Sequence, residues 1–457
     1  MDNSGWQDFI KIKDNFLTKN QKLNDKDIEI INSQMAKLKK EIAVNEERLL
    51  ELGRLLDYND LRKRDFSNAQ ITQIIQEDNQ TILEAQTYLK DQTTQDRDYM
   101  FGYPSNMTKE SSLISYLRWI ESQLYYINSC GSPYSEGNYR MSKRSKELAI
   151  INKVMTNLNM NKDEFWGYIT TGGTEGNLWG IREGYTKYPE GKLYFSEDTH
   201  YSALKGATIL PHAKYEVIPS IQGHIDKEKL LKAIFADPNA KKNGVILLLN
   251  YGTTTYGSID DIPAIINELT TKKIPYYLHV DAALYGGIPH NQLASPNEEL
   301  QHIIALGLDS ISISLHKYLG LPKTNGLLLA KTQNNSQFIE YIGQNDVTLC
   351  GSRDFLPFTT LQKITEQYER TSPEEYHKNI SLFETSLKEA HIPYEKGTPN
   401  GNIFVLKKPS DKLCKKYQLA TFNYNNSDKA HIIIFPFHKS TIIKELIKDL
   451  KEDFKEI

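Results

Sequence analysis

The regular alternation of short strand-like runs with helical stretches between residues 165 and 331 most restricts how this chain can fold. Seven runs rich in aliphatic and aromatic residues are strand candidates, namely WGYITT, KLYFSED, YEVIPS, GVILLLN, PYYLHVD, DSISISLHK and GLLLAK. Helical sequence separates them, as in DIPAIINELTTKK at 261–273. Strands that alternate with helices form mostly parallel sheets covered by helices on both faces. We therefore predict an α/β fold for this part of the chain.

A smaller domain is predicted after residue 331. The order there becomes helix-rich and continues with the strand candidates NIFVLKKP and AHIIIFPF, which a helix separates, and with a charged helix over 440–455. Such an order is typical of an α+β domain. We assign residues 96–335 to an N-terminal segment plus a large domain, and residues 336–457 to a small C-terminal α+β domain.

The first 95 residues have the pattern of two helices. Apolar residues recur three or four positions apart at Ile28, Ile31, Met35, Leu38, Ile42, Leu49, Leu52 and Leu56, and at compatible helical spacing at Ile71, Ile75, Ile82, Ala85 and Leu89. The polar stretch 57–68 between these sets is short enough for an antiparallel return, so we predict a helical hairpin over 1–95. Its expected role is packing on the chain's own body or across a dimer, and a coiled coil for a foreign partner is the alternative.

Composition excludes several classes of function. The 457 residues carry 55 Lys+Arg and 58 Asp+Glu, a net charge of -3, so the chain lacks the positive field typical of nucleic-acid binding. Uncharged runs such as VILLL at 245–249 are far shorter than the roughly 18 residues of a membrane span. Cys130, Cys350 and Cys414 are far apart, which suggests neither a disulfide framework nor a structural metal site. We expect a cytoplasmic protein without a nucleic-acid or membrane partner.

A glycine-rich segment follows the first strand candidate. Residues 172–177 read GGTEGN and lead into an apolar helix, so that backbone N–H groups and the Thr174 hydroxyl can approach an anion at a helix N-terminus. The segment lacks the Lys-Ser/Thr of a P-loop and is no GxGxxG, so neither ATP nor a dinucleotide is indicated. A purely structural turn is the alternative.

An acidic residue and a lysine follow two other strand candidates. Asp281 ends PYYLHVD and Lys317 ends DSISISLHK, and His200 comes shortly after KLYFSED. A pyridoxal-phosphate site requires a lysine amine, a carboxylate for the pyridine nitrogen and a cradle for the phosphate, and an imidazole could stack on the ring. An ion pair that closes the sheet, together with a structural histidine, is the alternative.

Other catalytic arrangements have less support. The sequence contains no HExxH and no GxSxG, and no paired carboxylates stand at a recognisable spacing. Metalloprotease, serine hydrolase and glycosidase chemistry therefore lack their usual signals.

Six blocks in order resemble a known family. They are YITTGGTEGNLWG, SEDTHYSALK, YGTTTYGSIDDI, HVDAALYGG, SISLHKYLG and CGSR, and FGYP from Phe101 also fits. Together they resemble the pyridoxal-phosphate-dependent group II amino-acid decarboxylases, which include bacterial histidine and plant serine decarboxylases. The resemblance runs from Phe101 to the C-terminus and implies an aspartate-aminotransferase-like fold (fold type I). The predicted hairpin lies outside it.

The resemblance implies a role for individual residues. Lys317 would bind the cofactor aldehyde, Asp281 would pair with the pyridine nitrogen, and His200 and Ala283 would lie on the two ring faces. The phosphate would be held by Gly173, Thr174, Ser314 and His316, and Thr254 would lie near the substrate side of the ring. A homodimer with its active site at the interface is implied, in which Ser352 reaches the neighbour's phosphate. Tyr341 is the candidate proton donor to the substrate carbon.

Two positions bear on the substrate. Relatives of the histidine and serine type continue Gly-Ser-Arg with Asn-Gly-His, whereas this chain continues with Asp354, Phe355 and Leu356. Tyr285, just after Asp-Ala-Ala, could narrow the pocket or could simply pack at a strand end. Histidine is the expected substrate, with release of histamine and CO2, and Asp354 could meet its imidazole.

Alternatives to this reaction remain open at the level of sequence. They are the decarboxylation of serine or another amino acid, and an aminotransferase, aldolase or oxidative deaminase reaction on the same fold. A non-catalytic assembly protein is the last alternative, and the intact set of Lys317, Asp281 and His200 argues against it.

Overall fold

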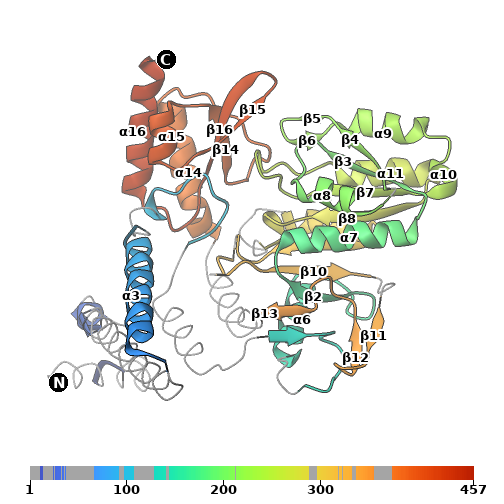
Figure 1. Ribbon diagram of the computed structural model, residues 1–457. Coiled ribbons are helices and arrows are strands. Elements are labelled where there is room, and N and C mark those ends of the chain that lie inside the picture. Colours follow the sequence, from blue (N-terminus) through green and yellow to red (C-terminus); the bar gives the residue numbers. More distant parts are fainter. Residues whose placement is uncertain are drawn as a thin grey trace. The chain divides into compact units, whose positions relative to one another are not determined.

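The structure is a computed structural model, and its chain divides into two compact units, Met1–Thr93 and Thr94–Ile457 (Figure 1). Each unit is described by itself. The described residues are 11–13, 24, 26–31, 33–34, 37, 66–91, 97–107, 128–139, 144–211, 213–287, 296–317, 319–321, 323–331, 336–354 and 373–456.

Helix α3 (Asn68–Asp91) of the first unit confirms that the second apolar repeat is helical. Its N-terminus is a capping box, in which the backbone N–H of Gln70 donates to Ser67 Oγ at 3.3 Å and that of Ser67 to Gln70 Oε1 at 2.9 Å. Ile71 is buried, as its apolar spacing predicts. Most of the first repeat, from Met35 to Leu56, lies outside the described residues, so the hairpin stays a prediction.

The second unit is built on a seven-stranded sheet, which confirms the predicted α/β fold. Its strands are β2 (Trp166–Thr170), β3 (Lys192–Ser196), β4 (Lys214–Ile218), β7 (Val245–Asn250), β8 (Tyr276–Asp281), β9 (Ser310–Ser314) and β10 (Gly326–Ala330). The order is β2-β10-β9-β8-β7-β3-β4; β10 is antiparallel to both β2 and β9, and the other neighbouring pairs are parallel. Each of the seven sequence runs forms one of these strands.

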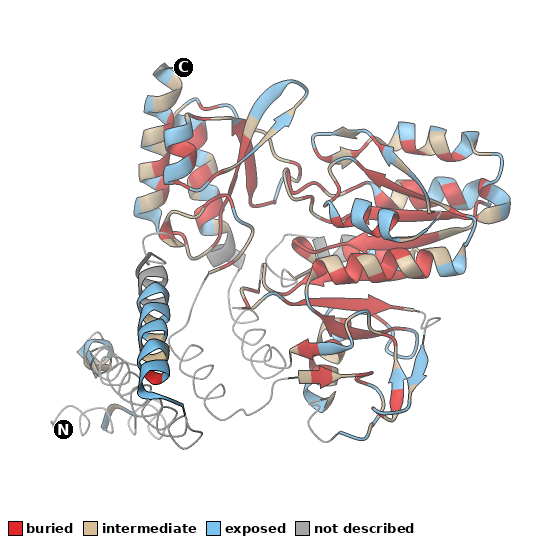
Figure 2. Ribbon diagram, in the orientation of Figure 1, coloured by how far each residue is buried: buried red, intermediate tan, exposed pale blue. Residues whose placement is uncertain are grey.

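Alternating side chains of the central strands pack on two helical layers. Ile246 and Leu248 of β7 join the apolar cluster that includes Ile181 of one layer, whereas Leu247 and Leu249 join the cluster of the other layer. The first layer contains α7 (Gly173–Lys187) and α8 (Ser202–Ile209), and the second contains α9 (Lys227–Ala236), α11 (Ile262–Thr271) and α12 (Pro296–Ala305). In Figure 2 the strands are red between helices that bury one face. Burial on both faces explains the continuous apolar runs.

Smaller elements surround this sheet. They are β1 (Asn128–Cys130), α6 (Arg144–Asn157), β5 (Ser220–Ile221), β6 (His224–Ile225), α10 (Ala240–Asn243), the 3-10 turn η1 (Tyr285–Gly287), β11 (Gln337–Ile339), β12 (Gln344–Asp346) and β13 (Ser352–Asp354). Strand β13 pairs with β1, and the buried Arg353 guanidinium forms an ion pair with Glu147 of α6. This pair holds the Gly-Ser-Arg segment against the sheet.

The described residues of the C-terminal part form an antiparallel sheet, in the order β14-β16-β15, and three helices. The elements are α14 (Pro373–Glu389), β14 (Ile403–Lys407), α15 (Asp411–Lys416), β15 (Ala420–Tyr424), β16 (Ser427–Ile433) and α16 (Ser440–Glu456). Asn425 and Asn426 make the turn between β15 and β16 with φ of 50° and 60°, a left-handed conformation that asparagine tolerates. The predicted strands and final helix are confirmed, whereas the boundary at residue 335 stays a prediction.

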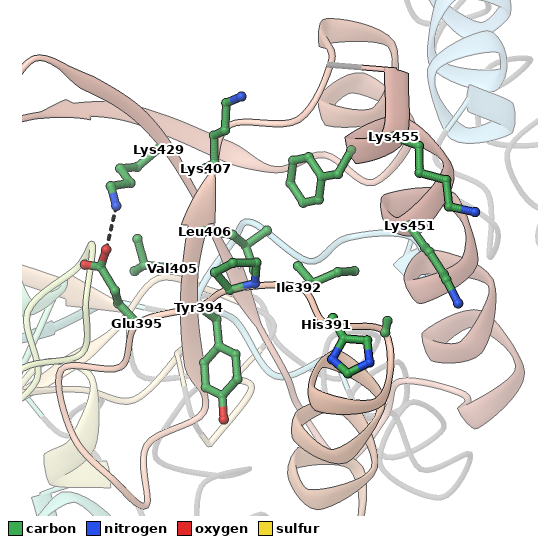
Figure 3. Close-up of a pocket in the computed structure, with 13 residues that line it drawn as sticks. His391, Ile392, Tyr394, Glu395, Val405, Leu406, Lys407, Lys429, Lys451 and Lys455 are labelled. Carbon is green, nitrogen blue, oxygen red and sulfur yellow. Dashed lines mark hydrogen bonds and ion pairs between the residues drawn. The ribbon is translucent and has the colours of Figure 1, made fainter.

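A cavity of about 480 Å³ lies in this C-terminal part, between the segment after α14, strand β14 and the end of α16 (Figure 3). Apolar side chains and lysines line it, and one of these lysines, Lys429, pairs with Glu395. It contains none of the predicted site residues. Within the described part of the chain, no helix is both long and apolar enough to cross a membrane.

Candidate active site

A second cavity, of about 680 Å³, gathers most of the predicted site residues. Those that line it are Gly173, Thr174, His200, Thr254, Asp281, Ala283, Ser314, His316 and Lys317. They lie at or after the carboxyl ends of β3, β7, β8 and β9 and in the first turn of α7. Neighbouring parallel strands end at the same edge of a sheet, which brings residues far apart in the sequence together here.

The start of helix α7 forms a cradle for an anion. The first backbone N–H groups of a helix have no partner within it and carry partial positive charge. Glycine at position 173 lets the start of the helix approach β9 closely, since a Cβ atom there would lie 2.6 Å from Ser314 Oγ and 3.2 Å from Ala283 Cβ. The Thr174 and Ser314 hydroxyls line the same cavity. These residues fit a phosphate group.

The carboxylate of Asp281 is buried and held by two hydrogen bonds. Its Oδ2 accepts from Nδ2 of Asn177 at 2.7 Å, and its Oδ1 accepts from the backbone N–H of Ala283 at 3.0 Å. Donors at both oxygens hold the carboxylate in one orientation. A fixed, charged carboxylate at this position suits the protonated nitrogen of a pyridine ring.

Lys317 lies in the same cavity, three residues after β9 ends. Burial lowers the pKa of its amine, and the charge of Asp281 opposes that shift. The segment that contains FGYP anchors it, because the backbone N–H of Asn106 donates to the Lys317 carbonyl at 2.6 Å. An amine with a lowered pKa is more often neutral and is the better nucleophile.

His200 follows β3 and is partly buried. Burial lowers the pKa of its imidazole, Lys317 and Lys205 add to that shift, and Asp281 opposes it. Nδ1 lies 2.9 Å from Ser202 Oγ. The ring is therefore oriented by the first residue of α8 and is favoured in its neutral form.

Tyr341 and Ser352 do not line this cavity. Tyr341 is 72% exposed, in the turn between β11 and β12. Ser352 is also exposed, and its Oγ accepts from Asn128 Nδ2 at 3.0 Å. The role predicted for Ser352 involves a second subunit, and the roles of both residues stay predictions.

The two positions discussed for the substrate have different surroundings. Tyr285 is buried among glycines, near Gly257 and Gly401, which confirms the packed interpretation. Asp354 pairs with Lys323 at 3.3 Å and lines an adjoining cavity of about 430 Å³. That cavity shares Thr171 and Thr324 with the larger one.

Sequence reasoning did not single out Asn177, Ser202 and His279. Asn177 closes the GGTEGN segment, and its side chain contacts both Asp281 and Ser202. A signal was present in PYYLHVD, where Tyr277, His279 and Asp281 alternate with apolar residues of a buried strand. Within the described residues, no group of three or more His, Cys, Asp or Glu side chains is arranged to hold a metal ion.

Comparison with known proteins identifies the relatives of this chain. The model of the pyridoxal-dependent decarboxylase conserved domain matches residues 188–356. A histidine decarboxylase of Morganella morganii is 32% identical over 369 residues, covering 78% of this chain and 93% of the relative. Serine decarboxylase 2 of Oryza sativa subsp. japonica is 30% identical over 370 residues, covering 78% and 75%.

Solved structures agree on the fold. L-methionine decarboxylase from Streptomyces sp. 590 superposes with a TM-score of 0.68 at 21% sequence identity, covering 81% of this chain and 94% of that one. At this identity the likeness concerns the fold, and it supports the assignment to fold type I.

Proposed function

The chain belongs to the pyridoxal-dependent decarboxylase family, enzymes that release CO2 from amino acids with pyridoxal phosphate, and we propose that its substrate is histidine and its product histamine. One observation carries the assignment of the site: Asp281, Lys317 and the α7 cradle line one cavity. The bacterial histidine decarboxylases that it resembles support the choice of substrate.

The cofactor-binding roles are proposed from the lining of this cavity. Asp281 holds a proton on the pyridine nitrogen, and Lys317 supplies the amine for the aldehyde. Gly173, Thr174, Ser314 and His316 hold the phosphate, His200 and Ala283 lie against the ring, and Thr254 lies on the substrate side. When bound, pyridoxal phosphate supplies a conjugated ring that accepts the electron pair released when a bond at the substrate α-carbon breaks.

The reaction also depends on charged and proton-donating side chains of this chain. The Asp281 carboxylate would stabilise a protonated pyridine nitrogen, because opposite charges in a buried site stabilise each other. Tyr341 is proposed to return a proton to the α-carbon after CO2 leaves. Lys317 would supply the amine that holds the cofactor aldehyde between turnovers.

We also propose a homodimer in the cytoplasm. Tyr341 and Ser352 are exposed in the single chain, so a second copy could receive them at its own cavity. Analytical ultracentrifugation should give twice the chain mass, and Ser352→Ala should weaken cofactor binding without changing that mass. The three cysteines are free thiols, which is consistent with a reducing compartment.

The substrate proposal is tested by incubating the holoenzyme with each of the twenty amino acids and measuring CO2 and amine release. Histamine should form with the highest kcat/KM. Serine is the second candidate, because a plant serine decarboxylase is 30% identical. Absence of histamine at any histidine concentration would exclude the first choice and leave decarboxylation of another amino acid.

A further inference from the structure

A chain of buried, hydrogen-bonded polar side chains lies beneath the active-site cavity. Tyr277 OH lies 2.8 Å from Ser310 Oγ, Ser310 Oγ lies 2.7 Å from His279 Nδ1, and His279 Nε2 lies 3.0 Å from Asn177 Oδ1. All four side chains are at most 1% exposed. Buried polar groups cost free energy unless each is paired, so a complete chain of this kind is a constrained arrangement.

The backbone explains how these side chains meet. Tyr277, His279 and Asp281 are two residues apart along β8 and therefore share the face that α7 covers. His279 is directly opposite Ser310 of β9. Helix α7 can approach only because residue 180 is glycine, since a Cβ atom there would lie 2.1 Å from His279 Nδ1.

Asn177 joins this chain to the site. Its Nδ2 lies 2.7 Å from Asp281 Oδ2 and 2.9 Å from Ser202 Oγ, and Ser202 Oγ in turn lies 2.9 Å from His200 Nδ1. One amide thus contacts the carboxylate assigned to the pyridine nitrogen and, through one hydroxyl, the histidine assigned to the ring face.

The charge of Asp281 sets the direction of the hydrogen bonds toward His279. A carboxylate only accepts, so the group facing Asp281 must be the NH2 of Asn177, and its carbonyl oxygen must face His279. His279 therefore donates from Nε2 and accepts at Nδ1 from Ser310. Burial lowers the pKa of His279 to about 4, which agrees with a neutral ring.

Hydrogen bonds also determine which ring nitrogen of His200 carries the proton. Ser202 Oγ accepts from the second N–H of Asn177, which leaves the Ser202 hydroxyl hydrogen free to donate to His200 Nδ1. The backbone N–H of Ser202 also points at Nδ1, at 3.3 Å. Two donors aimed at Nδ1 require it to accept, so the ring proton lies on Nε2.

We propose that Asn177 is a positioning residue that orients the Asp281 carboxylate and fixes the Nε2–H tautomer of His200 through a single side-chain amide. This inference rests on the proposed cofactor site. It predicts that substitution of Asn177 affects both the Asp281 carboxylate and the His200 tautomer. Substitution of Ser202 should affect His200 alone.

The test uses the holoenzyme loaded with pyridoxal phosphate that carries ¹⁵N at the ring nitrogen. Asn177→Ala should reduce protonation of the ring nitrogen, seen in its ¹⁵N chemical shift, and weaken cofactor binding about 10- to 100-fold, the usual effect of losing a hydrogen bond to a charged group. Ser202→Ala should change only the His200 resonances and keep cofactor affinity within about threefold. Asn267→Ala, at an exposed position of α11, is the matched control and should change neither.

Two outcomes would overturn the inference. One is unchanged ring-nitrogen protonation and cofactor affinity in Asn177→Ala. The other is an Nδ1–H tautomer or a cation at His279 or His200 in the wild-type enzyme. The ¹⁵N spectra of histidine-labelled wild-type enzyme should instead show both rings as neutral Nε2–H tautomers. Failure of the substrate proposal would appear separately, as absence of histamine with these spectra unchanged.

Discussion

The seven-stranded and the three-stranded sheets of residues 94–457 bury polar groups in different ways. In the larger sheet, polar side chains occupy alternate positions of β8 and β9 on the face toward α7, and they hydrogen-bond to one another. In the smaller sheet, the buried His431 of β16 lies 3.1 Å and 3.0 Å from two backbone carbonyls, those of Thr255 and Gly102. The larger sheet therefore carries the candidate cofactor-binding groups, and the smaller sheet contributes Ala420 and His431 to the wall of the cavity.

The two cavities also differ in how their charged side chains are held. The site cavity contains a lysine whose pKa burial lowers and a carboxylate held by two donors. Around the cavity near α16 lie apolar side chains, three exposed lysines and the half-buried Lys429. Buried charge that is held in place indicates chemistry more reliably than cavity size or the presence of lysines. Five predictions test this contrast.

Lys317→Ala should show the largest effect. We expect decarboxylation to fall more than about 1000-fold, because Lys317 is the only lysine among the described residues that line the cavity. Circular dichroism and the melting temperature should stay close to those of the wild type. Lys429→Ala, in the other cavity, is the matched control and should retain activity. Normal turnover of Lys317→Ala would contradict the proposal that this cavity binds the cofactor.

Asp281→Asn should reduce turnover about 100-fold or more while cofactor is retained, because a neutral amide does not stabilise a protonated pyridine nitrogen. The measurement is kcat together with the absorption spectrum of the bound cofactor. Near-normal turnover would instead support a purely structural ion pair between Asp281 and Lys317.

Acid should destabilise both regions, in part through one deeply buried histidine in each, His279 and His438. Burial lowers the pKa of His279 and of His438 to about 4 from 6.5, so the unfolded chain binds protons that the folded chain does not as the pH falls from 6.5 to 4. The free energy of unfolding should drop over this range by up to about 3 kcal/mol for each histidine. Urea unfolding at pH 7 and pH 4.5 measures it.

Variants assign this loss to the two histidines. His279→Gln and His438→Gln should each show a shallower dependence of unfolding free energy on pH than the wild type. An identical dependence in both variants would show that other groups cause the acid sensitivity.

Gly180→Ala should destabilise the larger region by about 1–3 kcal/mol, because the added Cβ atom would lie 2.1 Å from His279 Nδ1 and overpack a closed contact. Gly287→Ala is the matched control, since the nearest atom to its Cβ is 3.7 Å away. Urea unfolding of the two variants compares them. Equal stabilities would mean that α7 can move away from β8 at little cost.

Asp354→Ala should have the smallest effect, and that effect should be confined to substrate binding. If the adjoining cavity receives the imidazole, KM for histidine should rise about tenfold, as for one lost hydrogen bond to a charged group, with little change in kcat. The activity on a smaller amino acid serves as the reference. An equal change for both substrates would place the effect in the Lys323 ion pair rather than in recognition.

Much of the site could be predicted because parallel strands share one direction. Once PYYLHVD and DSISISLHK are assigned as neighbouring strands, Asp281 and Lys317 must lie at the same edge. The partners of Asp281 could not be predicted in this way. Asn177 is 104 residues away from it, and their contact depends on how deeply α7 packs onto β8.

The sequence was enough to predict the seven strands of the larger sheet, β14, β16 and the last helix, and the edge at which the candidate site residues lie, because apolar periodicity and turn residues act over a few neighbouring positions. Tertiary structure alone decided which polar side chains pair. The His279–Ser310 contact depends on strand register, and the Asn177–His279 contact depends on the close approach that Gly180 allows. Hydrogen bonds need partners within about 3 Å, and only the packed chain sets such distances.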